Sequence, residues 1–165
     1  MKSKVLFLGC NHNEIPYLEN LQERGFYVVA TDMNPDAPGM KIADSSIVCG
    51  YDDFEGLEDA ISKEGPDHFD KVFTASAQFA HIGASYISKK LGISYPSMDS
   101  VMACLDKKAF YPLFQENGID IPETHYVRNF TELEKALSAY PDETDFYLKS
   151  DYSKNPNHIY TGKSS

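Results

Sequence analysis

The amino-acid sequence predicts an α/β fold, in which a Rossmann-like parallel sheet carries helices on both faces and a smaller α+β region follows. Short apolar stretches at residues 4–9, 26–31 and 71–75 alternate with segments of helical periodicity. Continuous apolar strands are typical of parallel sheets, because both faces of such a sheet are covered. The alternation of strands and helices therefore indicates a doubly wound sheet.

The first two strands are expected at residues 4–9 and 26–31, with a helix between them that ends near residue 24. Asn11 or Asn13 can cap this helix, because a side-chain oxygen can accept a hydrogen bond from a free backbone N–H. The unit is a βαβ crossover, which is expected to be right-handed. The crossover places the first two strands side by side in one sheet.

A third, short strand ends at Val48, and Asp52 or Asp53 can cap the helix that follows. The fourth strand is expected at residues 71–75, before a helix at 78–91. Ligands of doubly wound sheets bind outside the carboxyl ends of the strands. The residues near these ends that we single out as candidates on the substrate side are Cys10, Asn11, His12, Asp32, Asn34, Ser76 and Gln78.

The smaller region is expected to open on a helix with clear start and end signals. Asp106 can cap its first turn, and Gly118 ends it because glycine adopts the left-handed conformation easily. Pro112 lies inside this helix and lacks an N–H, so we expect a kink that costs about 3 kcal/mol or an irregular first turn. We place one domain at residues 1–95 and a second, incomplete one at 96–165.

Beyond this helix, residues 123–127 alternate as a strand does, and Asn129 or Thr131 can cap another helix. The side chains of that helix expected to face inward are Phe130, Leu133 and Leu137. A short apolar strand then ends in Lys149, and residues 161–165 are expected to fray. A lysine at the end of an apolar strand is an unusual choice unless its ammonium group has a partner.

Charge and cysteine usage exclude several classes of protein. The net charge is −10 and no long basic run is present, which argues against nucleic-acid binding. Cys10, Cys49 and Cys104 are widely spaced and form no C-x-x-C pair, as expected for free thiols in a reducing cytosol. No apolar stretch has the length of a signal peptide or a membrane span. These features predict a cytoplasmic protein that acts on small molecules.

The sequence lacks complete motifs for dinucleotide binding, metal binding or nucleophilic catalysis. Asp32 lies about twenty residues past Gly9, as in dinucleotide-binding folds, but the turn lacks the G-x-G-x-x-G pattern. The histidines show no metal-ligand spacing, so we predict no metal site. Cys10 could act as a nucleophile, yet a buried cysteine more often packs as a small apolar side chain.

Four stretches, in order, resemble the start of the ATP-grasp superfamily, which includes biotin carboxylase, carbamoyl phosphate synthase and the D-alanine ligases. Residues 32–44 read D-M-N-P-D-A-P-G-x3-A-D, and residues 73–93 are similar to the family's fourth strand and next helix. Residues 106–122 read D-K-x3-Y-P-L-F-x3-G-I-x-I-P, and the apolar strand ending in Lys149 follows. The resemblance covers essentially the whole chain and implies a pre-ATP-grasp domain followed by the opening part of an ATP-grasp domain.

The resemblance implies an ATP-dependent ligase that converts a small-molecule carboxylate to an acylphosphate, which an amine or similar nucleophile then attacks. It implies that Lys107 and Lys149 contact the ATP phosphates, and that Ser153 and Lys154 lie in a loop that covers them. In the family this loop is usually rich in glycine, whereas residues 150–158 contain none. The magnesium ligands of the family come from a second subdomain that this sequence lacks. We therefore expect part of a ligase, inactive alone, that needs the missing subdomain or a partner chain.

Two plainer hypotheses remain beside this one. Lys107 and Lys149 can be read as ordinary surface lysines, since most lysines are solvent-exposed. The chain can also be a non-catalytic Rossmann-like module for small-molecule binding or dimerisation, or a small nucleotide sensor. A homodimer is among the arrangements that the sequence leaves open.

Overall fold

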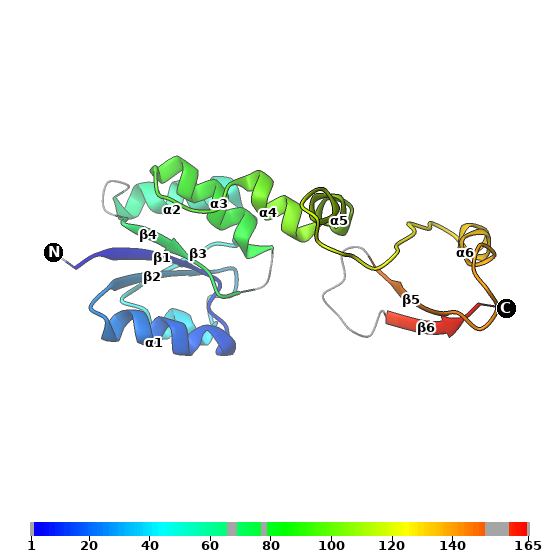
Figure 1. Cartoon of the computed structure of the whole chain (residues 1–165). Coiled ribbons are helices and arrows are strands. Elements are labelled where there is room, and N and C mark those ends of the chain that lie inside the picture. The colour runs from blue at the N-terminus through cyan, green and yellow to red at the C-terminus, as the bar shows by residue number, and fades with distance from the viewer. Residues whose placement is uncertain (1, 66–68, 77–78, 151–158, 165) are drawn as a thin grey trace. The chain divides into compact units, whose positions relative to one another are not determined.

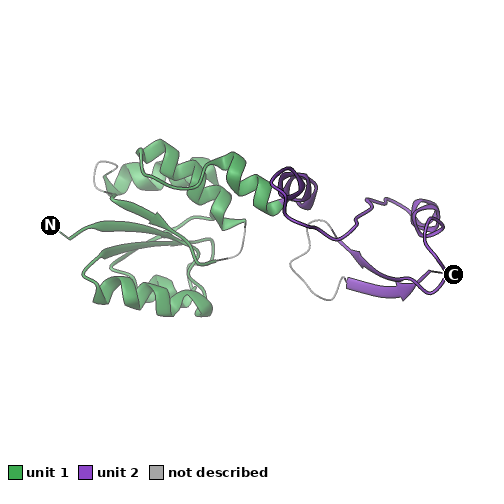
Figure 2. Cartoon of the chain, in the orientation of Figure 1, with its two compact units in different colours: residues 1–105 green, residues 106–165 purple. Residues whose placement is uncertain are grey.

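The chain forms two compact units, Met1–Leu105 and Asp106–Ser165, in the computed structural model (Figures 1 and 2). The structure describes residues 2–65, 69–76, 79–150 and 159–164. Residues 1–105 form unit 1 and residues 106–165 form unit 2.

Unit 1 is built on a four-stranded, fully parallel sheet with the order β3-β2-β1-β4. The strands are β1 (Lys4–Leu8), β2 (Tyr27–Asp32), β3 (Ser45–Val48) and β4 (Lys71–Phe73). In register, Leu6 of the central β1 lies between Val29 and Val72 of its two neighbours. The predicted Rossmann-like parallel sheet is thereby confirmed.

Helices cover both faces of this sheet, with α1 on one face and α2 and α3 on the other (Figure 1). The helical elements of unit 1 are η1 (His12–Glu14), α1 (Ile15–Glu23), η2 (Pro38–Lys41), α2 (Phe54–Glu64), α3 (Ala80–Leu91) and α4 (Met98–Leu105). Asp53 caps α2 by accepting the Gly56 N–H at 2.9 Å. The expected cap of the first helix by Asn11 or Asn13 is not formed, because the 3-10 turn η1 precedes α1.

The core of unit 1 has two layers, one on each face of the sheet. Leu6 and Leu8 of β1 pack with Leu57 of α2 on one face, and Phe7 packs with Leu18 of α1 on the other. All five side chains are fully buried. Alternate residues of one strand thus serve opposite faces, which explains why β1 is apolar throughout.

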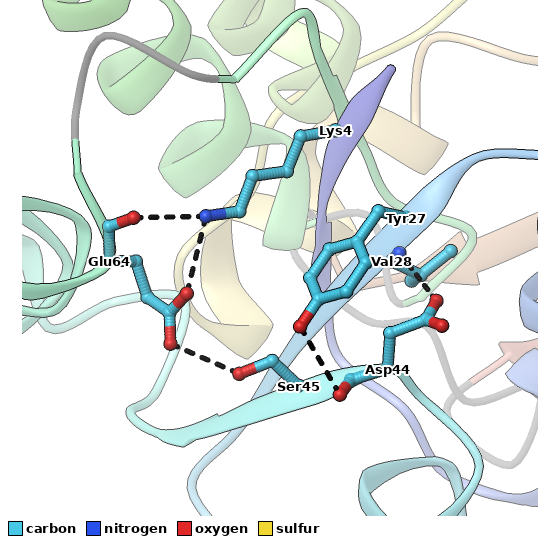
Figure 3. A network of polar contacts seen from close by, with 6 residues as sticks. All are labelled: Lys4, Tyr27, Val28, Asp44, Ser45 and Glu64. Atoms are coloured by element: carbon cyan, nitrogen blue, oxygen red, sulfur yellow. Dashed lines mark hydrogen bonds and ion pairs between the residues drawn. The ribbon is translucent and has the colours of Figure 1, made fainter. Parts of the chain in front are cut away.

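A polar network ties the amino-terminal edge of the sheet together (Figure 3). Lys4 Nζ donates to the Glu64 carbonyl at 3.0 Å and to Glu64 Oε2 at 3.2 Å, while Ser45 Oγ donates to Glu64 Oε1 at 3.0 Å. Asp44 accepts the Val28 N–H at 2.9 Å in the same region. These bonds fix the end of α2 to β1 and β3, at the edge opposite to the one where ligands of such sheets bind.

Unit 2 contains two helices and a two-stranded antiparallel sheet. Its elements are α5 (Lys107–Glu116), α6 (Phe130–Leu137), β5 (Asp145–Lys149) and β6 (Ile159–Lys163). Asp106 caps α5 as predicted, accepting the Lys108 N–H at 2.8 Å. The helix starts at Lys107 and includes Pro112, so the irregular first turn considered from the sequence is not found.

Three predictions for unit 2 are wrong. Residues 123–127 form no strand; instead the Tyr126 hydroxyl donates to the Lys107 carbonyl at 3.0 Å. Residues 161–163 do not fray but belong to β6, with Thr161 opposite Tyr147. The third concerns Phe130 of α6, which was expected to face inward and is exposed.

Helix α6 turns only part of its predicted face inward. Asn129 caps it by accepting the Glu132 N–H at 2.9 Å. Leu133 and Leu137 are half-buried, but Phe130 is 71% exposed at the first position of the helix. Among the described helices of the chain, none is long and apolar enough to cross a membrane.

Candidate functional site

The Asp32 carboxylate joins the carboxyl ends of β1 and β2. Its Oδ2 accepts the Cys10 N–H at 2.9 Å, and its Oδ1 accepts the Asn34 N–H at 2.9 Å. Asp32 is buried, and a buried carboxylate is tolerated only when hydrogen bonds replace its water. Asp32 therefore fixes the two loops that form this edge of the sheet.

The D-M-N-P-D-A-P-G stretch folds back onto the turn after β1. Asn34 Oδ1 accepts the Asp36 N–H at 3.0 Å, and the Asn34 carbonyl accepts the Ala37 N–H at 3.0 Å. Gly39 then donates its N–H to the Cys10 carbonyl at 2.8 Å. A Cβ at Gly39 would lie 2.6 Å from the Cys10 Cβ, so the close return of this loop requires glycine.

The end of β4 meets the same edge. Thr74 Oγ1 donates to the Leu8 carbonyl at 2.8 Å and accepts the Ser76 N–H at 3.1 Å. Gly9 has a φ of +77°, and a Cβ there would lie 2.8 Å from Ser76 Oγ. Ser76 thus lies against the turn after β1, while Gln78 lies outside the described residues.

Cys10 is fully buried, and its thiol lies 3.8 Å from the Thr31 carbonyl, to which it donates. Burial, reinforced by the negative charges of Asp32 and Glu14, raises the pKa of Cys10 to about 12. The thiol is therefore protonated at neutral pH, and a protonated thiol is a poor nucleophile. This environment favours the interpretation of Cys10 as a small core side chain.

Sequence reasoning missed Glu14 at this edge. Asn11 and His12 are exposed, but Glu14 is only 6% exposed, and its Oε2 has no hydrogen-bond partner among the described residues. Buried charged groups nearly always have partners, so this oxygen can accept a donor from a bound molecule or water. The available signal was its place just before α1, where an acidic side chain is favourable.

In unit 2, the Lys107 side chain contacts the backbone just after Lys149, at the end of β5. Lys107 Nζ donates to the carbonyl of Ser150, the residue after Lys149, at 2.9 Å. Lys149 is exposed, with its Nζ 5.7 Å from the centre of the Tyr147 ring. The other two residues predicted to contact ATP, Ser153 and Lys154, lie outside the described residues.

An ammonium group held at the end of a strand, next to a second lysine in the sequence, is a feature that suits an anionic ligand such as a polyphosphate. The sequence motifs placed these lysines on separate elements, and the Lys107–Ser150 hydrogen bond connects those elements. In the part of the chain that the structure describes, no cluster of three His, Cys, Asp or Glu side chains could hold a metal ion.

No family model matches the chain, but known proteins do. The formate-dependent phosphoribosylglycinamide formyltransferase of Bacteroides thetaiotaomicron is 28% identical over 137 residues, which are 82% of this chain and 34% of that protein. The homologous enzyme of Erythrobacter litoralis is 28% identical over 142 residues, 84% of this chain and 36% of that protein. The chain spans about a third of the length of these curated relatives.

Solved structures match over both units. N5-carboxyaminoimidazole ribonucleotide synthetase from Thermotoga maritima has a TM-score of 0.73 at 22% identity, covering 99% of this chain and 41% of that one. The corresponding synthetase from Staphylococcus aureus, complexed with ADP, has a TM-score of 0.73 at 16% identity, covering 98% of this chain and 42% of that one. These neighbours are ATP-grasp ligases, as the sequence motifs predicted. The chain therefore has the fold of the amino-terminal region of the ATP-grasp ligases.

Proposed function

We propose that this chain is the amino-terminal part of an ATP-grasp ligase, in which Lys107 and Lys149 bind the phosphates of ATP. The activity of the whole enzyme would be carboxylate activation. A carboxylate oxygen attacks the γ-phosphorus of ATP and ADP leaves; an amine or similar nucleophile then attacks the acylphosphate carbon and releases phosphate. The chain needs its second subdomain, or a partner chain that supplies one, for this chemistry.

The observation that carries the proposal is the hydrogen bond from Lys107 to the Ser150 carbonyl. It brings the Lys107 side chain to the end of β5 that carries Lys149, although the two bonded residues lie 43 positions apart in the sequence. The likeness of the chain to a synthetase complexed with ADP supports a nucleotide as the ligand of the proposed ligase. Lysine ammonium groups would act there as point charges on the phosphate oxygens.

In this proposal the phosphate-binding lysines act by electrostatics. Phosphoryl transfer places charge on the transferred group and the leaving ADP, and fixed positive charges stabilise that distribution. Magnesium, held by the second subdomain, would supply further neutralisation. The strand-end edge of unit 1 offers the Glu14 carboxylate and the Asn11 and Ser76 side chains for the acceptor substrate.

Calorimetric titration with ATP, with and without magnesium, tests the proposal on the whole chain. We expect Lys149→Ala and Lys107→Ala each to weaken binding about tenfold, because each removes a charge-assisted contact. Lys163→Ala is the matched control: Lys163 lies on β6 of the same sheet, and its Nζ pairs with Glu143 at 2.7 Å.

Two results would contradict the assignment of the lysines. One is equal ATP affinity of the parent chain and Lys149→Ala. The other is an equal loss of ATP affinity in Lys163→Ala. That result would show that the affinity depends on the overall charge of unit 2 rather than on contacts at a defined site. Circular dichroism of each variant separates loss of contact from loss of fold.

A further inference from the structure

A pocket in unit 1 lies between the loop after β3, the start of α2 and the start of α3. Its volume is about 360 Å³. The residues that line it are Tyr51, Asp52, Phe54, Phe79 and Ile82. The lining thus comprises three aromatic side chains, one aliphatic side chain and one carboxylate, and none of the five lining residues is basic.

The walls of this pocket are held in place by contacts behind them. A Cβ on Gly83 of α3 would lie 2.0 Å from the Tyr51 carbonyl oxygen, so only glycine allows the loop after β3 to approach the helix this closely. Phe54 stacks on Tyr86 with ring centres 4.4 Å apart and planes at 18°. Tyr51 and Phe54 are therefore positioned before any ligand arrives, which lowers the entropy cost of binding.

The carboxylate of the pocket is available to a ligand. Asp52 is exposed, and no described residue forms a hydrogen bond or ion pair with its carboxylate. Its neighbour Asp53 differs, because Asp53 Oδ1 accepts the Gly56 N–H at the start of α2. Asp53 is committed to the helix cap, whereas Asp52 can meet a bound molecule.

Aromatic faces and a carboxylate attract the same kind of ligand. The face of an aromatic ring carries negative electrostatic potential, so it favours a cation within about 6 Å of its centre. An adjacent carboxylate adds direct charge attraction, which is stronger near low-dielectric aromatic walls than in water. A neutral apolar ligand would fill the pocket equally well but would make no use of Asp52.

We infer that this pocket binds a small organic cation, an alkylammonium with a short apolar or polar arm. The volume of about 360 Å³ lies at the low end of the range of roughly 300–1,000 Å³ found for small-molecule sites, so the ligand is small. The inference goes beyond the proposed ligase function and does not depend on it, since the pocket shares no residue with Lys107, Lys149 or the Asp32 edge.

Choline and its uncharged analogue 3,3-dimethyl-1-butanol, which has nearly the same shape, are the probes that test it. We expect choline to shift backbone amide signals near Asp52 and Ile82 in a nitrogen-15 NMR titration of the full chain. The analogue should bind at least about fivefold more weakly, because it lacks the charge that the rings and Asp52 attract. ATP titration of the same sample tests the ligase proposal separately.

Two substitutions locate the effect. Asp52→Asn and Phe79→Leu should each weaken choline binding about three- to tenfold, whereas Asp59→Asn should leave it unchanged. Asp59 is the matched control because it is an exposed aspartate on α2, the helix that begins two residues after Asp52, and it does not line this pocket. The NMR spectra of the free variants show directly whether they fold.

The inference is overturned by any of three results. These are the absence of choline-induced shifts at the pocket, equal affinities for choline and the neutral analogue, and equal losses in Asp52→Asn and Asp59→Asn. The last result would mean that choline binds non-specifically to the acidic surface of the chain rather than in this pocket.

Discussion

Units 1 and 2 hold their structure by different means. In unit 1 the sheet lies between two apolar layers, and side chains such as Leu6, Leu18 and Leu57 are fully buried. In unit 2, Ser164 is the one buried residue among those that the structure describes. A hydrophobic core thus defines unit 1, whereas hydrogen bonds and half-buried side chains define unit 2.

Ser164 shows how unit 2 is held together. Its N–H donates to the Thr144 carbonyl at 3.0 Å, its Oγ donates to the Pro141 carbonyl at 2.7 Å, and its Oγ accepts the Thr144 N–H at 3.0 Å. These bonds close one end of the β5–β6 pair. Isolated two-stranded sheets are marginally stable in water, so unit 2 is expected to be the less stable of the two.

Several large apolar side chains of unit 2 are exposed, unlike those in the core of unit 1. Phe130 is 71% exposed, Tyr147 68% and Tyr160 61%. Such side chains contribute little to the stability of unit 2 as it stands, because burial supplies the hydrophobic free energy. Substitutions should therefore separate the two units by the size of their effects.

The largest difference is expected between Leu57→Ala and Leu113→Ala. Leu57 is fully buried, so its truncation leaves a cavity and should lower the free energy of unfolding by about 2–5 kcal/mol. Leu113 of α5 is 45% exposed, and its truncation should cost less than about 1 kcal/mol. Urea unfolding followed by circular dichroism measures both. Similar losses in the two variants would mean that unit 2 has a core of its own in solution.

Removing an ion pair should also destabilise unit 1 more than unit 2, by a smaller amount than truncating a core leucine. The Lys4 and Glu64 side chains are 14% and 29% exposed, and Lys4 Nζ also lies 4.5 Å from the centre of the Phe69 ring. Lys4→Met should therefore cost about 1–3 kcal/mol, since it leaves a half-buried carboxylate with fewer donors. In unit 2 the Lys163–Glu143 pair is 56% and 76% exposed, and Lys163→Met should cost about 0–1 kcal/mol.

Salt provides the control for these two variants. Added sodium chloride screens exposed charges more than buried ones. The effect of Lys163→Met should disappear at about 1 M salt, while most of the effect of Lys4→Met should persist. Equal salt sensitivity would show that the Lys4–Glu64 pair is as open to solvent as the surface pair.

The same difference explains which parts of the fold could be predicted from sequence. In β1 every residue from Val5 to Leu8 is buried, so hydrophobicity alone marks the strand. In unit 2 no core selects a face, and residues 123–127 alternate as a strand does without a strand beside them. The inward position predicted for Phe130 was wrong for the same reason, because α6 has no buried face.

The candidate site likewise contains residues that the sequence predicts and residues that it does not. The edge formed by Cys10, Asp32 and Ser76 follows from topology, since the carboxyl ends of parallel strands meet at one edge. The buried carboxylate of Glu14 does not, because sequence patterns place charged residues outside. The aromatic pocket brings together residues 51–54 and 79–82, and no local pattern reports a contact between such separated segments.

The smallest expected effects concern the thiol groups of the cysteines. They are negligible at neutral pH and grow as the pH rises. Burial raises the pKa of Cys10 from its ordinary value of 9.0 to about 12 and the pKa of Cys49 to about 11. Cys104 is exposed. In the native chain at pH 8, Cys104 should react with a thiol reagent, while the thiolate fraction of Cys10 should be about a thousandfold below that of a thiol with a pKa of 9.

These raised pKa values also predict the direction in which the free energy of unfolding changes at alkaline pH. The unfolded chain loses the Cys10 proton above about pH 9, whereas the folded chain keeps it until about pH 12. The contribution of Cys10 to stability should therefore be complete below pH 9 and be lost between these values. Urea midpoints at pH 8 and pH 10.5 should differ less in Cys10→Ala than in the parent chain, and Cys104→Ala should behave like the parent. Part of the decline should remain in Cys10→Ala, because burial also raises the pKa values of Cys49 and of the half-buried Tyr95. An unchanged decline in Cys10→Ala would mean that solvent reaches the turn after β1, and unit 1 would then lack the closed core that distinguishes it from unit 2.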